Sequence, residues 1–212
     1  MTLAVIDYGM GNLYSLERAL DRLGAAHRRA TTPGEAAEAE RLILPGVGSA
    51  APAMARLRAG GWPEFLTDWT TVGKPLLGIC LGFQLLFESS EENGGTAGLG
   101  LLPGRVIRFR GAVKVPHMGW NDCHPAPAAR LFAGLDPADF YFVHSYHADG
   151  VPADHQEATC DYGGEFIAAA SAPGRPLFGV QFHPEKSGPA GATLLSNFIR
   201  MNSGHRGAEK QR

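Results

Sequence analysis

The sequence predicts an α/β fold: an open, mixed but mostly parallel sheet with helices on both faces, and antiparallel strands in the C-terminal half. In the first half, short apolar runs alternate with segments of helical periodicity, the order that builds a parallel sheet. In the second half, strand-like runs follow one another with little helix between them. The chain has 212 residues and is 44% hydrophobic, which suffices for one sizeable core. We expect one domain over residues 1–202 and a polar tail over residues 203–212.

The first half contains four runs that suit strands, most of them apolar enough to be buried, and several segments that suit helices. Four leucines between Leu13 and Leu23 fall at helical spacing, and Gly24 stands where a C-terminal cap belongs. Ser49 precedes an alanine-rich segment and is placed to cap it. The expected strands cover residues 3–6, 27–31, 42–44 and 75–79, and the expected helices cover 13–23, 36–40, 49–59, 62–70 and an apolar segment through residue 87.

The alternation ends at Asn93-Gly94-Gly95. From there, turns rich in Pro, Gly and Asp link the strand-like runs directly, so part of this half should be antiparallel. The last segment, 190–201, returns to helical periodicity. The expected strands cover residues 101–110, 140–146, 156–162, 166–170 and 177–182.

Composition excludes several classes of protein. The formal net charge is −2 and the pI is about 6.4, with no basic run, which argues against binding to nucleic acid or to a membrane surface. Residues 1–7 lack the basic start of a signal peptide, and no apolar segment approaches the roughly 20 residues that span a bilayer. Three scattered cysteines make no disulfide framework. We therefore expect a cytoplasmic protein that uses no cofactor and no metal.

Cys80 stands between two glycines in Gly78-Ile79-Cys80-Leu81-Gly82, at the turn from an apolar strand to a helix. A nucleophile elbow of the G-x-S-x-G kind has this order, here with cysteine in place of serine. The glycines suit a turn too tight for a Cβ on either side, which exposes the side chain at its tip. The N–H groups and the positive dipole end of the following helix favour a thiolate. The alternative is a buried structural cysteine, but the two glycines favour the nucleophile.

A thiol nucleophile needs a base, and the base needs an orienting partner. Among eight histidines, His183 is the best placed, because it follows an apolar run and precedes Pro184. The proline keeps His183 extended, and residues i and i+2 of an extended chain share one side, so we expect Glu185 beside it. Like Cys80, this pair follows a buried strand, at the sheet edge where ligands bind. We predict a Cys80–His183–Glu185 triad; the alternative for His183 is a strand-end histidine with no function.

Three other patterns are weaker. Pro45-Gly46-Val47-Gly48 follows a buried strand and suits an oxyanion hole, although spacing alone favours an ordinary glycine-rich turn. Gly9-Met10-Gly11 lacks the third glycine of a dinucleotide motif, and no acidic residue ends the second strand. His144-Ser145-Tyr146-His147 has no cysteine or carboxylate placed around it, which argues against a metal site. Cys123 and Cys160 have no elbow and no adjacent base, so we expect them to be inert.

At this point the chain resembles a known family. The class I, triad-type glutamine amidotransferases are similar at Gly78-Ile79-Cys80-Leu81-Gly82-Phe83-Gln84 and Phe182-His183-Pro184-Glu185. The resemblance runs from the first strand to about Met201. More narrowly, the glutaminase subunits of imidazole glycerol phosphate synthase are similar at Asp7-Tyr8-Gly9-Met10-Gly11-Asn12-Leu13, Pro45-Gly46-Val47-Gly48, Val115-Pro116-His117-Met118-Gly119-Trp120-Asn121 and His183-Pro184-Glu185-Lys186-Ser187.

The resemblance implies a flavodoxin-like fold in which Cys80 hydrolyses glutamine to glutamate through a thioester. Ammonia would then pass through a channel to a (β/α)8-barrel cyclase subunit, in a heterodimer that makes imidazole glycerol phosphate and aminoimidazole carboxamide ribotide for histidine biosynthesis. The resemblance also implies roles for individual residues. These are a glutamine pocket of Gly46, Gly48, Gln84, Ser145 and Tyr146, an oxyanion hole of the Leu81 N–H and the Val47–Gly48 peptide, and a partner interface near Asn12, Met118, Trp120 and Lys186.

Three alternatives stand beside this interpretation. The P-H-M-G-W-N segment and Lys186 argue against a glutaminase that serves another synthase, such as anthranilate or guanylate synthase. Gln84 and the lack of a substrate groove argue against a stand-alone cysteine peptidase or esterase, and the intact triad argues against a non-catalytic binding module. We further hypothesise that the 45–48 loop is a switch, whose glycines let a peptide flip toward the oxyanion only when the synthase ligand is bound.

Overall fold

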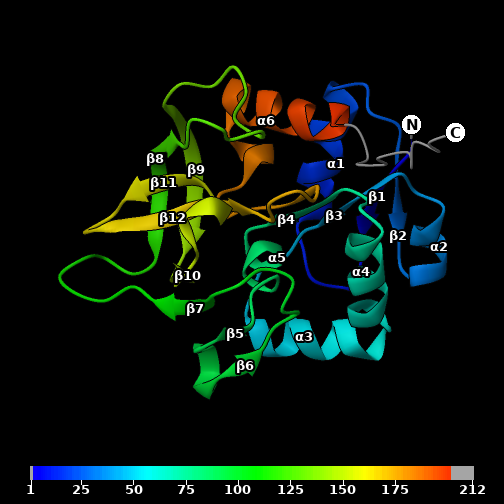
Figure 1. Cartoon of the computed structure of the whole chain (residues 1–212), viewed down its shortest axis with the longest axis horizontal. Helices are drawn as coiled ribbons and strands as arrows, with labels where there is room; N and C mark the ends of the chain where they lie inside the picture. The colour runs from blue at the N-terminus through cyan, green and yellow to red at the C-terminus, as the bar shows by residue number, and fades with distance from the viewer. Residues whose placement is uncertain (1, 202–212) are drawn as a thin grey trace, which may run out of the picture.

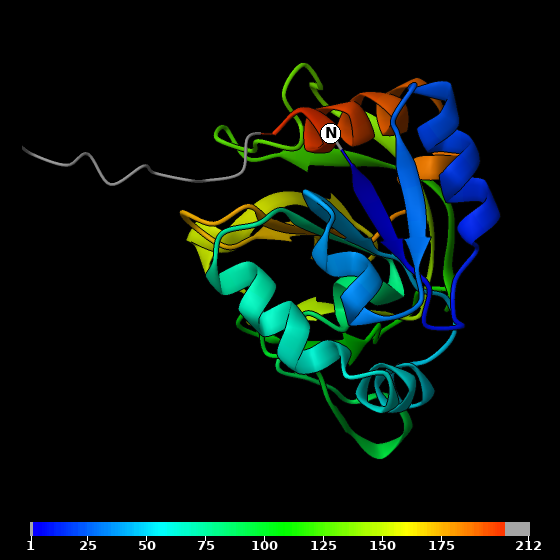
Figure 2. The same ribbon diagram turned by 90° about the vertical axis from the view of Figure 1, so that its right-hand side faces the viewer.

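The computed structural model describes residues 2–201 (Figures 1 and 2). The predicted polar tail, 203–212, lies outside these residues, and one domain over residues 1–202 stays a prediction. No helix within the described part of the chain is long and apolar enough to cross a membrane.

Five neighbouring strands form the parallel part of the sheet, in the order β2-β1-β3-β4-β13. This is the 2-1-3-4-5 order of flavodoxin-like folds. A strand covered on both faces needs a continuous apolar sequence, and four of the five strands are buried along their whole length. The predicted parallel sheet is thus confirmed, with β1 (Leu3–Ile6), β2 (His27–Ala30), β3 (Arg41–Leu44), β4 (Leu76–Ile79) and β13 (Leu177–Val180).

Helices cover both faces of this sheet, as Figures 1 and 2 show. Successive strand residues point to opposite faces, so Val5 and Ile6 belong to different halves of the core. Val5 packs in a cluster that includes residues of α1 (Leu13–Arg22) and α6 (Gly188–Arg200). Ile6 packs in a cluster that includes residues of α2 (Pro33–Ala37), α3 (Ala50–Ala59), α4 (Trp62–Thr71) and α5 (Leu81–Gln84).

Most pairs among the remaining strands are antiparallel, as predicted for this half. β12 (Glu165–Ser171) runs antiparallel to β13 and continues the sheet through β10 (Tyr146–Asp149), β7 (Arg105–Arg108), β5 (Ser89–Ser90) and β6 (Thr96–Ala97). A branch leaves β12 through β11 (Gln156–Asp161), β8 (His117–Pro125) and β9 (Ala138–His144). Single-turn 3-10 helices occupy η1 (Glu92–Gly94), η2 (Ala153–His155) and η3 (Pro184–Lys186).

Three predicted elements differ clearly at their boundaries. The strand predicted over 101–110 is confined to β7, Arg105–Arg108. The strand predicted over 140–146 is two strands, β9 and β10, which Ser145 separates. β8 was not predicted, because Gly119 and several polar residues hide its alternation. The predicted 36–40 helix begins earlier, at Pro33, where the Thr32 hydroxyl accepts the Glu35 N–H at 3.3 Å.

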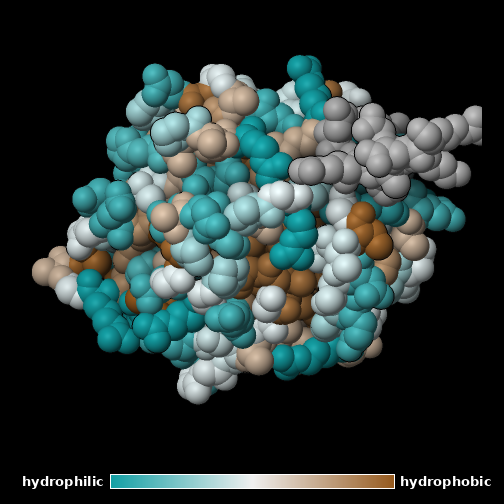
Figure 3. All heavy atoms as spheres, viewed as in Figure 1, coloured by the Kyte–Doolittle hydropathy of each residue, from teal (hydrophilic) through white to brown (hydrophobic). Residues whose placement is uncertain are grey.

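Two local predictions near the site were wrong. Ser49 precedes α3, but its side chain makes no capping bond; the carboxylate of Glu92 instead accepts the Ala50 N–H at 2.7 Å. The helix after Cys80 ends at Gln84 and does not continue through Phe87. The reason is that the carbonyls of residues 85–87 accept N–H groups from the 99–102 segment, which replaces further helical turns. On the face drawn in Figure 3, a patch of hydrophobic residues shows around α5, with smaller patches elsewhere among hydrophilic residues.

Candidate active site

Three loops meet at one edge of the parallel sheet. β4 pairs with β3 on one side and with β13 on the other, all in parallel, so their carboxyl ends lie side by side. The 45–48 loop follows β3, Cys80 follows β4, and His183 follows β13 by three residues. Ligands of open α/β sheets bind at such an edge.

The elbow carries its strain on the cysteine. Cys80 has φ 54° and ψ −110°, a backbone conformation that residues with a side chain rarely adopt, and its N–H donates to the Val180 carbonyl at 2.8 Å. The flanking glycines leave room for the turn. A Cβ on Gly78 would lie 2.9 Å from the Gly82 carbonyl oxygen, and a Cβ on Gly82 would overlap the Leu44 carbonyl oxygen. The predicted tight turn is therefore confirmed.

His183 and Glu185 form a buried pair. The Glu185 Oε1 atom lies 2.8 Å from His183 Nδ1, and the two side chains are 3% and 4% exposed. A carboxylate accepts only, so this bond places a proton on Nδ1 and leaves Nε2 for chemistry. The predicted partnership within the pair is present, and its low exposure keeps water from competing for the bond.

The backbone that positions this pair differs from the predicted one. His183 is extended, with φ −101° and ψ 94°, as Pro184 requires. Beyond it the chain turns into η3, so Glu185 reaches the imidazole through a helical turn and not through the i, i+2 alternation of a strand. The Ser187 hydroxyl fixes the turn, because it donates to the His183 carbonyl at 2.6 Å and accepts the Tyr141 N–H at 3.0 Å.

Cys80 and His183 are coupled electrostatically. Both residues line one cavity, and the buried His183 Nε2 atom has no partner within hydrogen-bonding geometry among residues 2–201. Burial is the largest single influence and disfavours the imidazolium. The sulfur of Cys80 and the carboxylate of Glu185 together outweigh it and raise the pKa of His183 to about 9. The imidazole is therefore equipped to hold a proton at neutral pH.

A cavity of about 340 Å³ opens in front of the nucleophile. Most of the predicted pocket and oxyanion residues line it together with Cys80 and His183: Val47, Gly48, Leu81, Gln84, Ser145 and Tyr146. His144, from the His144-Ser145-Tyr146-His147 segment expected near the cleft, also lines it, and three further lining residues were not predicted: Glu92, Pro116 and Val143. Among the described lining residues, Glu92 is the acidic one.

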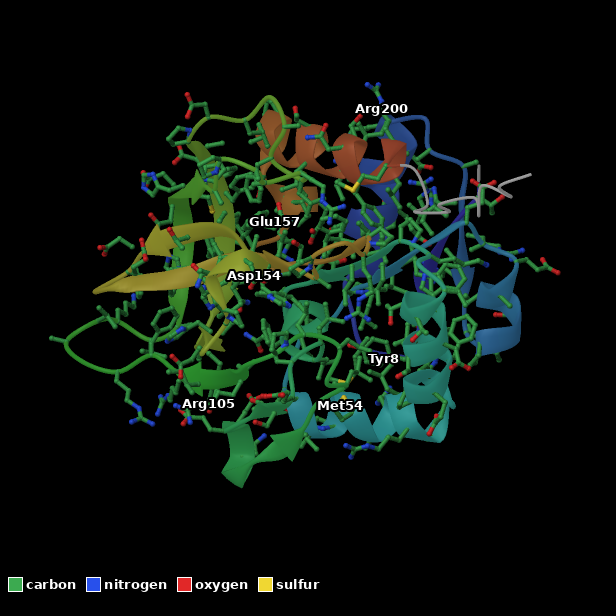
Figure 4. All side chains as sticks on the ribbon, viewed as in Figure 1. Tyr8, Met54, Arg105, Asp154, Glu157 and Arg200 are labelled. Carbon is green, nitrogen blue, oxygen red and sulfur yellow. The ribbon has the colours of Figure 1, made fainter. Side chains whose placement is uncertain are left out.

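Gly46 is not among the residues that line this cavity, and its place in the glutamine pocket stays a prediction. It borders a smaller adjacent pocket together with Asn12, His183 and Glu185. A Cβ on Gly46 would lie 2.6 Å from the hydroxyl of Tyr8, the residue labelled in Figure 4, and 3.0 Å from the Gly82 nitrogen. The α-carbon of Gly46 is thus packed against the elbow itself.

Two backbone features suit the predicted oxyanion hole. Leu81 is the first residue of α5, where a helical N–H has no carbonyl partner within the helix. Because α5 has only four residues, its dipole stabilises negative charge less than the dipole of the longer helix we predicted. Gly48 has φ 102°, which a β-branched residue would strain. The roles of Val47, Gly48 and Leu81 stay predictions.

The predicted interface residues lie near the triad and are exposed. Met118 and Trp120, on β8, are 62% and 58% exposed. The ring of Trp120 lies 6.1 Å from that of Tyr141, and the Lys186 ammonium lies 5.7 Å from the same tyrosine ring. Asn12 is exposed at the start of α1, where its side chain accepts the Ser15 N–H at 3.4 Å. We call Met118, Trp120 and Lys186 the apolar rim.

The other two cysteines lie together, away from this cavity. The sulfur atoms of Cys123 and Cys160 are 2.9 Å apart, and both residues are buried free thiols on neighbouring strands. Burial and the contact with Cys160 raise the pKa of Cys123 far above its usual range. Such a thiol is a poor nucleophile, consistent with the expected inertness. Within residues 2–201, no group of three or more His, Cys, Asp or Glu side chains is arranged to hold a metal ion.

The fold and the site define a class of protein. The family described as "Glutamine amidotransferase class-I" matches residues 4–201, and the chain belongs to this family. Solved structures agree on the fold. A structure titled PurLQS from Thermotoga maritima superposes with a TM-score of 0.75 at 19% identity and covers 93% of this chain and 97% of that one. Another, titled glutamine amidotransferase, gives 0.74 at 19% identity, over 93% and 96% of the two chains.

Curated relatives are more specific. A protein of Moorella thermoacetica named "Imidazole glycerol phosphate synthase subunit HisH" is 50% identical over 212 residues, covering 96% of this chain and 99% of the relative. Proteins of the same name are 49% identical in Desulfitobacterium hafniense, over 92% of each chain, and 44% identical in Bacillus subtilis, over 94% of this chain and 96% of the relative.

Proposed function

We propose that the chain is the glutaminase subunit of an imidazole glycerol phosphate synthase, which releases ammonia from glutamine for a cyclase partner. The observation that carries the proposal is the strained Cys80 elbow opposite the buried His183–Glu185 pair at one cavity. The names of relatives 44–50% identical over nearly the whole chain support the particular synthase.

The chemistry begins with the sulfur of Cys80. His183 Nε2 takes the thiol proton, and the electron pair of the resulting thiolate attacks the side-chain amide carbon of glutamine while the carbonyl electrons move to the oxygen. The Leu81 N–H and the Val47–Gly48 peptide stabilise that oxyanion. His183 gives its proton to the amide nitrogen, the carbon–nitrogen bond breaks, and ammonia leaves. Water, deprotonated by the now neutral His183, then cleaves the thioester and releases glutamate.

The polar groups of the cavity suit an amino acid. Both Nε2 protons of Gln84 are used within the protein, at 2.9 Å from the Tyr146 carbonyl and 3.0 Å from Gln181 Oε1, so its side-chain oxygen is the atom left for substrate. Together with Glu92 it provides acceptors for the α-ammonium of glutamine. The backbone of Ser145 and the Gly48 peptide border the rest of the substrate.

The apolar rim is the proposed docking surface for a (β/α)8-barrel cyclase subunit in a heterodimer. Large exposed apolar side chains such as Met118 and Trp120 are typical of protein interfaces. Lys186 follows Glu185 directly, so a partner seated on the rim lies next to the triad. A small pocket of about 10 Å³ that Asn12 borders lies against His183 and Glu185 on this side of the site.

The decisive experiment measures glutamate release by the purified chain, alone and with the cyclase subunit and its ribotide ligand. We expect release that depends on the partner. Release by the chain alone, indifferent to the cyclase, would keep the glutaminase chemistry and remove the synthase assignment. A chain that releases no glutamate in either state would remove both.

The acid role of His183 predicts the alkaline side of the pH profile. Its pKa is raised to about 9 in the folded chain, above the ordinary 6.5, so the imidazolium persists through neutral pH and is lost as the pH rises through 9. We expect kcat/KM for partner-stimulated glutaminase to fall there. Glu185→Gln removes one of the groups that raise this pKa, so the alkaline fall should move down by about one pH unit or more.

The matched control is Glu38→Gln, because Glu38 is an exposed carboxylate in a surface ion pair with Arg28. Its profile should match that of the unchanged chain. An alkaline fall that stays in place in Glu185→Gln contradicts the assigned acid.

A further inference from the structure

Gln181 is a fully buried amide that has no role in the proposed steps of glutamine hydrolysis. It lies between β13 and His183, and its Nε2 atom lies 4.0 Å from the Cys80 sulfur, within hydrogen-bonding geometry. Its Oε1 atom accepts from Gln84 Nε2 at 3.0 Å. A buried amide costs free energy unless it is bonded, so a glutamine here needs a reason that an apolar residue would not satisfy.

The orientation of the Gln181 amide follows from its neighbours. Gln84 Nε2 donates one proton to Gln181 Oε1 and the other to the Tyr146 carbonyl. Reversing the Gln84 amide would set its oxygen against the Tyr146 carbonyl, which can only accept, so that amide has one arrangement. Gln181 must therefore offer its oxygen to Gln84, which leaves its NH₂ group toward the sulfur.

The same network continues to β8. His144 Nδ1 lies 2.8 Å from the Tyr146 carbonyl, which can only accept, so Nδ1 carries a proton. Burial lowers the pKa of His144 to about 3 and that of His117 to about 4, so both rings are neutral. His144 Nε2 is then an acceptor, and His117 Nδ1 donates to it at 3.0 Å. His117 is the first residue of β8, next to Met118 of the apolar rim.

We propose that Gln181 is a catalytic residue of the glutaminase, which donates an N–H to the sulfur of Cys80, and that Gln84, His144 and His117 are positioning residues that hold it there. The inference deepens the proposed function and rests on it. The sulfur carries negative charge before it attacks the amide and again when the thioester breaks. An N–H group held at this position stabilises the charge in both steps and does not have to reorient between them.

The network also connects the nucleophile to the proposed docking surface. Each bond from His117 to Gln181 has one possible direction, so a shift of β8 at the apolar rim changes the placement of the donor at the sulfur. Such contiguous bonds are a physical route for coupling between sites. The partner would thus act on the sulfur as well as on the 45–48 loop.

Gln181→Glu is the sharpest test, because it keeps the shape of the side chain and replaces the donor by a carboxylate oxygen that repels a charged sulfur. Removing a hydrogen bond to a charged group predicts a fall in stimulated kcat of roughly 10- to 100-fold. The KM for glutamine should stay within about threefold, since Gln181 is not among the residues that line the substrate cavity. Gln181→Met, which lacks the donor and adds no charge, should show a smaller fall in kcat.

A second readout needs neither partner nor glutamine: the rate at which iodoacetamide alkylates Cys80 in the isolated chain. We expect it to slow about tenfold or more in Gln181→Glu, and by less in Gln181→Met, because alkylation also uses the charge on sulfur. A purely structural role would lower the midpoint of thermal unfolding but leave alkylation unchanged or faster. The control is Gln156→Glu, since Gln156, on β11, donates to the Val151 carbonyl and is not among the residues that line the cavity.

The two readouts separate this inference from the proposed function. Suppose that the unchanged chain releases no glutamate with its partner, while alkylation still slows in Gln181→Glu. The proposed function is then wrong, but the N–H donation from Gln181 to the Cys80 sulfur is supported. Wild-type kcat together with wild-type alkylation in both Gln181 variants overturns the inference.

Discussion

Cys80→Gly is expected to abolish glutamine hydrolysis and yet to be more stable than Cys80→Ala. Both changes remove the nucleophile, and loss of a nucleophile costs catalysis roughly a factor of 10⁴ or more. The two variants differ in backbone strain. At φ 54° and ψ −110°, alanine keeps the unfavourable conformation of Cys80, whereas glycine adopts it freely.

Urea unfolding followed by circular dichroism measures the difference. We expect the free energy of unfolding of Cys80→Gly to exceed that of Cys80→Ala by about 1 kcal/mol, opposite to the usual order of these residues. The control is Ala55→Gly on the exposed side of α3, which should lose about 1 kcal/mol. If alanine were the more stable residue at position 80, the elbow would not store strain.

Gly82→Ala is expected to disrupt both stability and catalysis. The new Cβ would overlap the Leu44 carbonyl oxygen and lie 2.8 Å from its carbon. These are backbone atoms of β3, which pairs with β1 and β4 and cannot yield as a flexible side chain would. We expect a loss of about 3 kcal/mol in the free energy of unfolding. The 45–48 loop continues from Leu44, so the oxyanion donors should separate and stimulated kcat should fall about 100-fold.

Gly34→Ala is the matched control for this change. Gly34 lies in α2, and a Cβ there would meet nothing closer than the Thr32 hydroxyl at 4.0 Å. Alanine should therefore stabilise the chain by about 0.5–1 kcal/mol without effect on glutamate release. A Gly82→Ala chain with unchanged unfolding and kcat would show that the elbow and the 45–48 loop are not packed against each other.

The Cys80 elbow and the His183–Glu185 contact could be predicted because their signals are local. Gly78 and Gly82 flank Cys80 within five residues, and Pro184 fixes the backbone of His183. The parallel strands were predictable for a similar reason, since burial on both faces requires continuous apolar runs. The predicted backbone of Glu185 was wrong. We expected the alternation of an extended chain to place it beside His183, but η3 begins one residue after His183.

The rest of the site depends on contacts that no local pattern records. Gln84 meets Gln181 across 97 positions of sequence, and His117 meets His144 across 27. The first pair depends on the parallel pairing of β4 with β13, and the second on the register of β9 with β8, a strand that itself went unpredicted. Glu92 could not be assigned either, because its cap on Ala50 and its place at the cavity come from tertiary packing.

The place of β13 sets the order in which this chain can become active during synthesis. β13 lies between β4 and β12, yet it is the last strand to leave the ribosome. Until then the nucleophile strand is an open edge, without the Val180 carbonyl that receives the Cys80 N–H. A nascent chain therefore holds no assembled elbow and no histidine beside it. Chains that end before residue 180 lack both the complete β13 and His183, so we expect them to release no ammonia from glutamine.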